Sequence, residues 1–380
     1  MKKNTLLTLI IICITLMGVF YFVSREKMKK ISSLEPGITA PFEIDPGKIT
    51  YISISNSTKT VTIALTDDIW RVVDKSNYPA DFKKIYEFIL SVLQIKPVQI
   101  VTEKKDYYDR FGVEDPGDNS STLISFLDKD KKDLLKIILG QQRTVSQGMP
   151  GGQYIRVFGK NQVYLITKEL DASANPVDWL NKDIVDIPRK DIRSITVTAP
   201  QDEDKIVLTK KEQGGEFELD SLPDNKKINT AIVNSLSDGL TGLRYEDVFP
   251  KDSEAVKDLT FDTTYTATLF NGSVYKVDVS QKDDKVYIKV AASYEAPTSE
   301  DEMQKADVKK AEDVIQNPAV VMQKVEEQSA LFSKWIYQIS SYRKDRFVKT
   351  KSELLEDKEL NKEEKSEEKQ QLEQPDAQQQ

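Results

Sequence analysis

The stretch WRVVDKSNYPADFKKIYEFILSVLQIKP, residues Trp70–Pro97, decides how this chain folds. An aromatic residue ends an alternating, strand-like run, and a turn at Asn77–Pro79 follows it. The spacing of the next apolar residues predicts a helix over Asp81–Leu93, which begins at the N-cap Asp81 and stops before Pro97. Its predicted apolar face consists of Phe82, Ile85, Tyr86, Ile89, Val92 and Leu93.

The same order of elements occurs a second time in the sequence. Phe217 ends a strand-like run, a turn covers Leu222–Asn225, and a second helix is indicated by Ile228, Ala231, Ile232 and Leu236. The segment KITYISIS resembles DIRSITVT, FGV resembles LTF, and YIRV resembles YIKV; Trp179 is paired with Trp335. The spacing between the paired segments varies, which is expected when two related domains carry different insertions.

Strands followed by one helix and then by hairpins favour an α+β fold over alternating strands and helices. We expect two tandem related domains, at residues 49–190 and 191–350, each an antiparallel sheet with a helix packed on one face. The second domain carries a helical insertion at about 297–330, interrupted near Asn317–Pro318. The apolar positions of this insertion either pack on their own domain or face a partner helix; they include Val314, Val320, Val321 and Val325.

The N-terminus carries an uncharged apolar run, Thr5–Val23, which is close to the roughly 20 residues that cross a bilayer. A cleaved signal peptide is the alternative, but its apolar region usually spans only about 7–15 residues and ends in a small-x-small site. The run instead ends in Phe20–Val23. We therefore expect residues 1–24 to form an N-terminal membrane anchor, a single transmembrane helix, and residues 25–48 to form a stalk.

The charges beside this run do not indicate its orientation in the membrane, because lysines lie on both sides of it. The very short tail before the run favours export of the C-terminal body. We expect a single-pass protein of the inner (cytoplasmic) membrane with the bulk of the chain extracytoplasmic.

The net charge of −8 is concentrated at the C-terminus, where residues 351–380 hold ten acidic residues and five lysines. The remaining chain is therefore nearly neutral, which argues against nucleic acid as a partner. Because residues 351–380 are rich in Glu, Lys and Gln and lack aromatic residues, we predict a disordered acidic tail.

The sequence contains no histidine, and its single cysteine, Cys13, lies in the apolar run. This composition excludes Ser-His-Asp and Cys-His catalysis, zinc sites that use histidine, and disulfides within the soluble part. We assign no catalytic, cofactor-binding or metal-binding residues, and we expect a protein that is not an enzyme.

Three groups of residues are candidate sites. The loop Gln141–Gly152 lacks the GK[ST] of a phosphate-binding loop and is either a mobile hairpin loop or a lip that binds a partner. Acidic clusters at strand ends lack calcium-binding spacing and are expected to be solvated turns, although a glycosidase pair among them stays open; they are Asp67–Asp68, Asp128–Asp130, Asp202–Asp204 and Asp283–Asp284. Trp70, Trp179 and Trp335 either stack on sugars or pack in the core, and the pairing favours the core.

The duplicated order of strands, helix, FGVED-like link, hairpins and tryptophan, behind an N-terminal anchor, resembles the bacterial domain-of-unknown-function family 4340. The resemblance covers about Ile49–Phe347. It implies a single-pass envelope protein, often encoded beside gliding-type components of ABC exporters, and the family offers no established catalytic residues. The acidic tail and residues 297–330 lie outside the resemblance.

Together these features predict a non-enzymatic, membrane-anchored extracytoplasmic accessory or scaffold subunit of an ABC-type export or envelope system, with an ABC-type permease complex as partner. The alternative is an extracytoplasmic glycan- or peptide-binding module with a cleft between the two repeats. A hydrolase is a third class, which the missing histidine disfavours.

Overall fold

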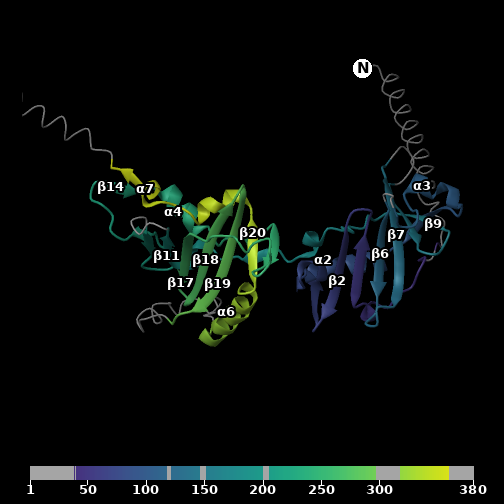
Figure 1. The fold of residues 1–380 in the computed structure, drawn as a ribbon, viewed down its shortest axis with the longest axis horizontal. Helices are drawn as coiled ribbons and strands as arrows, with labels where there is room; N and C mark the ends of the chain where they lie inside the picture. Colours follow the sequence, from purple (N-terminus) through teal and green to yellow (C-terminus); the bar gives the residue numbers. More distant parts are fainter. Residues whose placement is uncertain are drawn as a thin grey trace, which may run out of the picture. The chain divides into compact units, whose positions relative to one another are not determined.

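A computed structural model describes residues 38, 40–117, 121–145, 151–199, 205–296 and 317–358. The chain divides between Asn181 and Lys182 into two compact units, called unit 1 and unit 2 below (Figure 1). Both consist mainly of antiparallel sheets with a few helices, so the α+β class is confirmed.

Unit 1 contains one nine-stranded sheet in which all neighbouring strands are antiparallel. In spatial order the strands are β4 (Tyr78–Pro79), β3 (Ile69–Val72), β2 (Thr60–Thr66), β1 (Tyr51–Ser55), β6 (Thr122–Leu127), β7 (Asp133–Arg143), β8 (Gly152–Val157), β9 (Val163–Ile166) and β5 (Pro97–Thr102). Ile52 and Ile54 of β1 are fully buried, because one face of this central strand lies in the core.

The predicted helix is present as α2, Phe82–Leu93, and the side chain of Asp81 accepts the amide N–H of Lys84 at 3.1 Å as its N-cap. Its predicted apolar face is partly wrong, because Ile85, Phe88 and Val92 are buried whereas Phe82 and Tyr86 are exposed. The helix carries apolar residues on more than one side, and periodicity alone does not say which side meets the sheet.

The shorter elements of unit 1 follow the sequence closely. Helix α3, Tyr108–Phe111, follows the 3₁₀ helix η3 (Lys105–Tyr107) and ends at Gly112, whose φ of 63° is the left-handed conformation expected of a helix-terminating glycine. The hairpins predicted after the helix are formed by β6 with β7 and by β8 with β9. The 3₁₀ helices η1 (Pro46–Lys48), η2 (Val73–Lys75) and η4 (Pro176–Trp179) complete the unit.

Unit 2 contains an eight-stranded antiparallel sheet. Its spatial order is β13 (Glu218–Leu219), β12 (Ile206–Thr209), β11 (Ile192–Thr198), β17 (Thr263–Leu269), β18 (Ser273–Lys282), β19 (Lys285–Tyr294), β20 (Trp335–Ile339) and β16 (Asp247–Pro250). Two additional strand pairs join β10 (Asp183–Val185) to β15 (Leu243–Arg244) and β14 (Lys226–Ile228) to β21 (Leu355–Asp357).

The second predicted helix is α4, Thr230–Ser237, with Asn229 as its N-cap. Ile228 was assigned to this helix, but it lies in strand β14. Val233 and Leu236 are the large apolar side chains that the helix buries, whereas Ile232 is only half-buried. The sequence placed the helix start too early because an apolar residue before a cap fits the helical spacing as well as one inside the helix.

The predicted insertion contains helix α6, Pro318–Phe332, which begins at the N-cap Asn317. Val321 and Val325 are buried, and α6 packs on β19, as Figure 1 shows. These two positions therefore pack on their own unit, which was one of the alternatives from the sequence, whereas Val320 is exposed. Val314 and the rest of 297–316 lie outside the described residues.

The C-terminal boundary of the folded body differs from the prediction of a disordered tail from residue 351. After the 3₁₀ helices η5 (Arg189–Asp191) and η7 (Ser341–Arg346) in unit 2, the chain forms helix α7, Lys351–Leu354, and continues into β21. Leu354 is fully buried. The composition did not reveal this folded segment, because acidic residues and lysines lie around its buried leucine in the sequence. Residues 359–380 lie outside the described residues.

The corrected face of α2 gives a direct test of its packing. We expect Ile85→Ala to lower the free energy of unfolding of unit 1 by about 2–5 kcal/mol, because Ile85 is fully buried against the sheet. The control Tyr86→Ala should change it by no more than about 0.5 kcal/mol, because surface substitutions rarely cost more. Calorimetric melting of both variants checks this, and equal losses would contradict the observed face.

Candidate functional site

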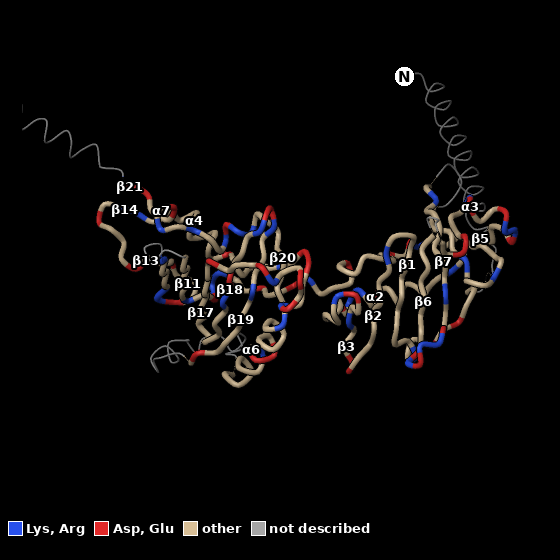
Figure 2. Tube along the Cα trace, viewed as in Figure 1, with Lys and Arg blue, Asp and Glu red and all other residues tan. Residues whose placement is uncertain are grey.

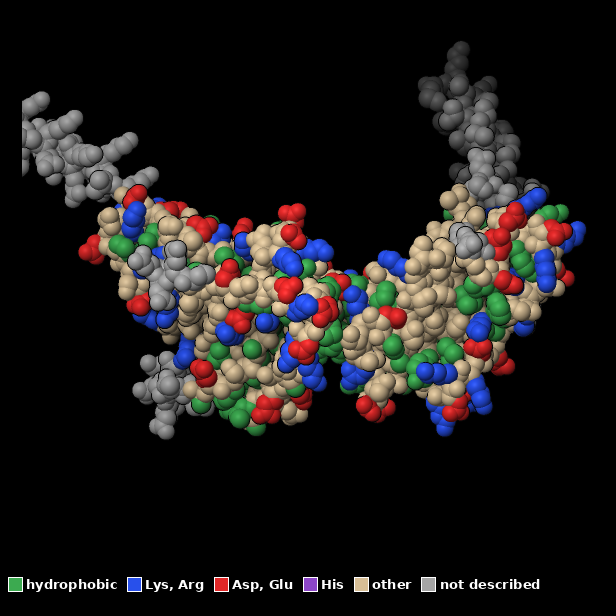
Figure 3. All heavy atoms as spheres, viewed as in Figure 1, with side chains coloured by type: hydrophobic (Ala, Val, Ile, Leu, Met, Phe, Trp, Pro, Cys, Tyr) green, Lys and Arg blue, Asp and Glu red, His purple; other side chains and the backbone are tan. Residues whose placement is uncertain are grey.

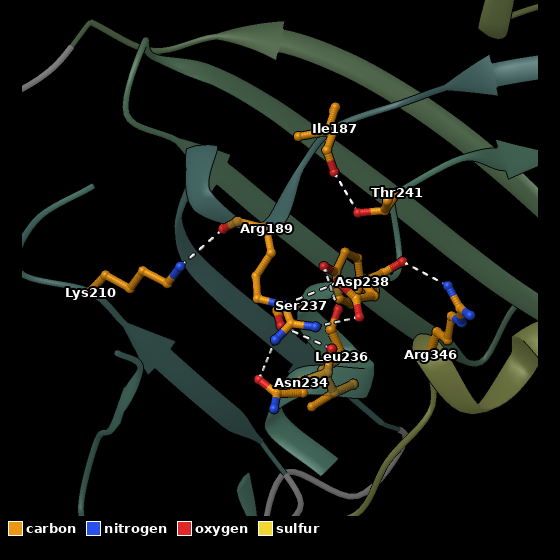
Figure 4. Close-up of polar contacts among 10 residues, drawn as sticks. Ile187, Arg189, Lys210, Asn234, Leu236, Ser237, Asp238, Thr241 and Arg346 are labelled. Atoms are coloured by element: carbon orange, nitrogen blue, oxygen red, sulfur yellow. Dashed lines mark hydrogen bonds and ion pairs between the residues drawn. The ribbon is translucent and has the colours of Figure 1, made fainter. Parts of the chain in front are cut away.

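A polar cluster surrounds the C-terminal end of α4 (Figure 4). Arg189, from η5, forms a two-point ion pair with Asp238: its Nε donates to Oδ1 at 3.1 Å and its Nη2 to Oδ2 at 2.5 Å. Its Nη1 also donates to Oδ1 of Asn234 at 2.6 Å. The planar guanidinium suits this arrangement because it presents several donors in a fixed fork. These contacts join η5, near the start of unit 2, to the C-terminal end of α4.

Two further arginines donate to main-chain oxygens, one at the C-cap of this helix and the other in the turn that follows it. Arg346 Nη1 donates to the carbonyl of Asp238 at 3.3 Å. Arg343 donates through Nη1 to the carbonyl of Thr241 at 3.2 Å and through Nη2 to that of Gly242 at 2.5 Å. The last carbonyls of a helix lack intrahelical donors, and cations are favourable beside them. These arginines therefore hold the fold together.

Burial accounts for two perturbed groups near the same cluster. The Tyr265 hydroxyl donates to the carbonyl of Leu236 at 3.0 Å, and burial raises the pKa of this tyrosine. Lys210 Nζ donates to the carbonyl of Arg189 at 3.0 Å and lies 4.4 Å from the ring centroid of Phe217. Desolvation, followed by the nearby Arg189 charge, lowers the pKa of Lys210. Both groups contact main chain or a ring in a buried setting, so we assign them packing roles.

Unit 1 has a buried cation of the same kind in Arg156 of β8. Its Nε donates to the carbonyl of Val113 at 2.8 Å and its Nη1 to that of Lys160 at 3.1 Å. Its Nη2 contacts Oδ1 of Asp115 at 2.5 Å, and the guanidinium lies 4.4 Å from the ring centroid of Tyr108. Each donor nitrogen of this buried side chain thus has an acceptor, which satisfies the requirement for burying a charge.

In its described part, the loop Gln141–Gly152 brings together no group of side chains that would form a binding or catalytic site. Gln142 Nε2 donates to Oε2 of Glu169 at 2.9 Å, and Arg143 Nη1 donates to Oε1 of Gln99 at 3.2 Å, both in exposed positions. Residues 146–150 lie outside the described residues. Whether the loop is a mobile hairpin or a lip for a partner stays a prediction.

The acidic clusters that the structure describes occupy tight turns. Asp67 and Asp68 have φ of 51° and 60°, and Asp283 has φ of 53°, a conformation that Asp tolerates better than most residues. Asp128 Oδ1 accepts the amide N–H groups of Asp130 and Lys132, each at 2.9 Å. Asp202–Asp204 lie outside the described residues. Over the described ranges, no group of three or more Cys, Asp or Glu side chains is placed to hold a metal.

The three tryptophans are all buried, which agrees with the preference for a core role. Trp179 packs edge-on against Phe88 of α2 at 5.1 Å, and its indole N–H donates to the carbonyl of Ser173 at 2.7 Å. The pairing of Trp179 with Trp335 is wrong. Trp335 is the first residue of strand β20, whereas Trp179 is the last residue of a 3₁₀ helix. A tryptophan by itself does not indicate the element in which it lies.

An exposed aromatic pair on α2 was not predicted from the sequence. Phe82 and Tyr86 are 67% and 55% exposed, and their rings stack at 6.3 Å with an interplanar angle of 12°. Both residues were assigned to the core, because they fit the same helical spacing as the buried ones. In unit 2, Val320 and Met322 are exposed on α6, where Figure 3 shows hydrophobic side chains on the surface.

The surface charge is mixed in both units. Figure 2 shows lysine and arginine positions interspersed with aspartate and glutamate along the traced chain. The described helices include none that is both long and apolar enough to cross a bilayer. The predicted anchor, Thr5–Val23, lies outside the described residues.

The capping box of α7 predicts a pH dependence. Glu353 Oε2 accepts the amide N–H of Thr350 at 2.8 Å, and this bond lowers the pKa of Glu353 below its ordinary 4.5. Because the folded pKa is depressed, the stabilisation is present above pH 4.5 and is lost as pH falls through the folded value. Relative to the intrinsic exchange rate at each pH, we expect the protection of residues 351–357 against hydrogen exchange to fall below about pH 4.5, and Glu353→Ala, which removes the acceptor, to be less protected already at pH 7. Unchanged protection in Glu353→Ala would contradict the role of the cap.

The fold and these contacts define a sheet-rich α+β protein whose buried cations bind its own backbone. The chain belongs to the family described as domain of unknown function (DUF4340), whose family model matches residues 70–264. The match begins in β3 of unit 1 and ends in β17 of unit 2, so it is shorter than the resemblance over Ile49–Phe347 but includes residues of both units. A search of curated proteins found no match.

Proposed function

We propose that this protein is a non-enzymatic, membrane-anchored extracytoplasmic scaffold that serves as an accessory subunit of an ABC-type export or envelope system. Its anchor is the apolar run Thr5–Val23, and its two units form the body that meets the partner. The permease complex is the proposed partner, and the inner membrane is the proposed location with the body outside the cytoplasm.

One observation carries the scaffold proposal: the buried and half-buried arginines are engaged by the chain itself. Arg156 and Arg343 donate to main-chain carbonyls, and Arg189 pairs with a carboxylate on the neighbouring helix. A catalytic or ligand-binding cation needs free donors that converge on a substrate. Because these guanidinium groups hold parts of the chain together, their contacts support a rigid body that binds a partner protein.

We also propose that the two units are copies of one fold. The order β3-β2-β1-β6-β7-β8-β9-β5 has the same connectivity as β13-β12-β11-β17-β18-β19-β20-β16, which supports this proposal. A second support is the start of the helix. The amide N–H of Asp81 donates to the carbonyl of Trp179, and that of Asn229 donates to the carbonyl of Leu354, both at 2.8 Å. On this proposal Leu354, rather than Trp335, is the counterpart of Trp179.

Two small apolar clusters give the duplication a third support. One contains Tyr108 and Val113, with Val101 and Phe111 packed on it. The other contains Val256, with three partly buried residues packed on it: Phe249, Leu259 and Phe261. The spacing in the sequence is the same in both sets: Val101, Tyr108, Phe111 and Val113 correspond in order to Phe249, Val256, Leu259 and Phe261. A shared ancestor explains why both copies bury the link after β5 or β16.

The scaffold proposal is tested by affinity purification of the tagged full chain from detergent-solubilised native membranes. We expect an ABC ATPase and its permease to be enriched in stoichiometric amounts, and a tagged chain without residues 1–24 to lose them. Enrichment of a soluble glycan or peptide in place of any membrane complex would favour the binding-module alternative and contradict the scaffold.

The proposed orientation has its own test. Protease added to spheroplasts should digest the body while a cytoplasmic control protein stays intact. Protection of the body until the membrane is permeabilised would place it in the cytoplasm and end the proposal of export.

A further inference from the structure

The outward face of α2 is apolar at its N-terminal end. Phe82 and Tyr86 lie one turn apart on it with stacked rings, and each exposes more than half of its surface. The opposite face of the helix already meets the core through Ile85, Phe88 and Val92. The exposed aromatics are therefore not needed to attach the helix to its sheet.

Helix α4 provides an internal comparison. Counting from the N-caps Asp81 and Asn229, the buried residues Ile85 and Phe88 correspond to Val233 and Leu236. By the same count Phe82 corresponds to Thr230 and Tyr86 to Asn234. The same position in the fold thus accepts polar residues in unit 2. Large aromatic side chains at these positions of unit 1 require a cause other than folding.

We propose that the outward face of α2, defined by Phe82 and Tyr86, contacts the surface of an anionic lipid bilayer. This inference rests on the membrane anchor in the proposed function. Aromatic residues favour the interfacial region of a bilayer, where an apolar ring and a wet surface meet. From Phe82 to Lys96 the exposed charges are Lys83 and Lys96 against the single glutamate Glu87, a balance of +1 that suits anionic headgroups.

The length of the intervening chain supports this occupant. Sixteen residues, 24–39, separate the end of the apolar run from the first continuous described segment. Fully extended, they reach at most about 55 Å, so unit 1 is confined near the bilayer. Unit 2 follows unit 1 in the chain, and its helix α4 has polar residues at the matching positions. The apolar face thus occurs in the unit that is joined directly to the anchor.

Of the two lysines beside the aromatic pair, only Lys83 has an ammonium group that is exposed on the outward face. The side chain of Lys83 is 83% exposed and lies 3.9 Å from Glu87 in a pair that solvent screens. Lys84 turns the other way: its ammonium pairs with Asp171 at 3.1 Å and lies 5.0 Å from the ring centroid of Trp179. Lys83 is consequently the position from which a probe reports on the outward face without removing either aromatic ring.

The test uses the full chain in which Cys13→Ser removes the single cysteine. A nitroxide is attached at Lys83→Cys, and in a matched control at Ala231→Cys, the corresponding exposed position of α4. Both proteins are reconstituted into vesicles of phosphatidylcholine and phosphatidylglycerol, and collisions with oxygen and with a water-soluble nickel chelate are measured by paramagnetic resonance. We expect the label at residue 83 to favour oxygen over nickel and the label at residue 231 to favour nickel.

A second variant adds Phe82→Ser and Tyr86→Ser to the label at residue 83, and we expect its label to become accessible to nickel. If the chain floats with the vesicles but both labels favour nickel, the α2 contact is refuted while the anchor stands. Shielding of residue 83 from both reagents would mean that a protein or a second copy covers the face, which also overturns the proposal. A chain that does not float with vesicles overturns the α2 contact and the anchor together.

Discussion

Removal of residues 351–380 will destabilise unit 2, even though this segment has the composition of a tail. The deletion removes α7 and β21, and with them the fully buried Leu354. It also removes the carbonyl that accepts the amide N–H of Asn229 at the start of α4. Loss of one buried leucine alone costs about 2–5 kcal/mol. In a unit of this size we expect the melting temperature to fall by at least about 5 °C.

The matched control stops the chain after Lys358, so that α7, β21 and their contacts stay in place. The ion pairs Lys226–Asp357 and Lys227–Glu356, at 2.5 and 3.4 Å, are kept in this shorter deletion. We expect its melting temperature to match that of the full chain. Calorimetry of both deletions decides the matter: if the longer deletion melts like the shorter one, the last folded element ends before residue 351.

The sequence was most informative where a local signal and the burial pattern agreed. The cap at Asp81, the stop before Pro97 and the glycine at 112 all give correct boundaries, because each sets the backbone through its own side chain or φ. The hairpins expected after the helix are present as β6–β7 and β8–β9.

The errors arose where apolar residues outnumbered the positions that the fold buries. Phe82 and Tyr86 share helical spacing with Ile85, and only the position of the sheet decides which of them is buried. Leu354 was missed for the opposite reason, since a single buried leucine in a charged context carries no periodic signal. Arg189 and Arg156 were not singled out, because most of their acceptors, side-chain oxygens for Arg189 and two carbonyls and a carboxylate for Arg156, lie more than 40 residues away in the chain. Such contacts leave no pattern in the sequence.

The core of unit 1 depends most visibly on Trp179, which is fully buried in a segment far in sequence from the helix it supports. Its ring meets Phe88 edge-on at 5.1 Å, its carbonyl accepts the amide N–H of Asp81, and its indole N–H donates to Ser173. We expect Trp179→Ala to lower the free energy of unfolding of unit 1 by about 3–5 kcal/mol, since it leaves a cavity of indole size under α2.

The variant Trp179→Phe separates the packing of the ring from the hydrogen bond. Phenylalanine keeps an aromatic edge near Phe88 but leaves the carbonyl of Ser173 without the donor that now lies 2.7 Å away. A fully buried acceptor without a donor costs about 1–3 kcal/mol, and Ser173 is only half-buried, so the loss should be smaller than this and lie between wild type and Trp179→Ala. Chemical denaturation that follows the unfolding of unit 1 measures the free energy of unfolding of both variants. If Trp179→Ala is tolerated with almost no loss, the indole does not hold α2 on the sheet, and the core of unit 1 must rest on the aliphatic side chains of β1 and β6.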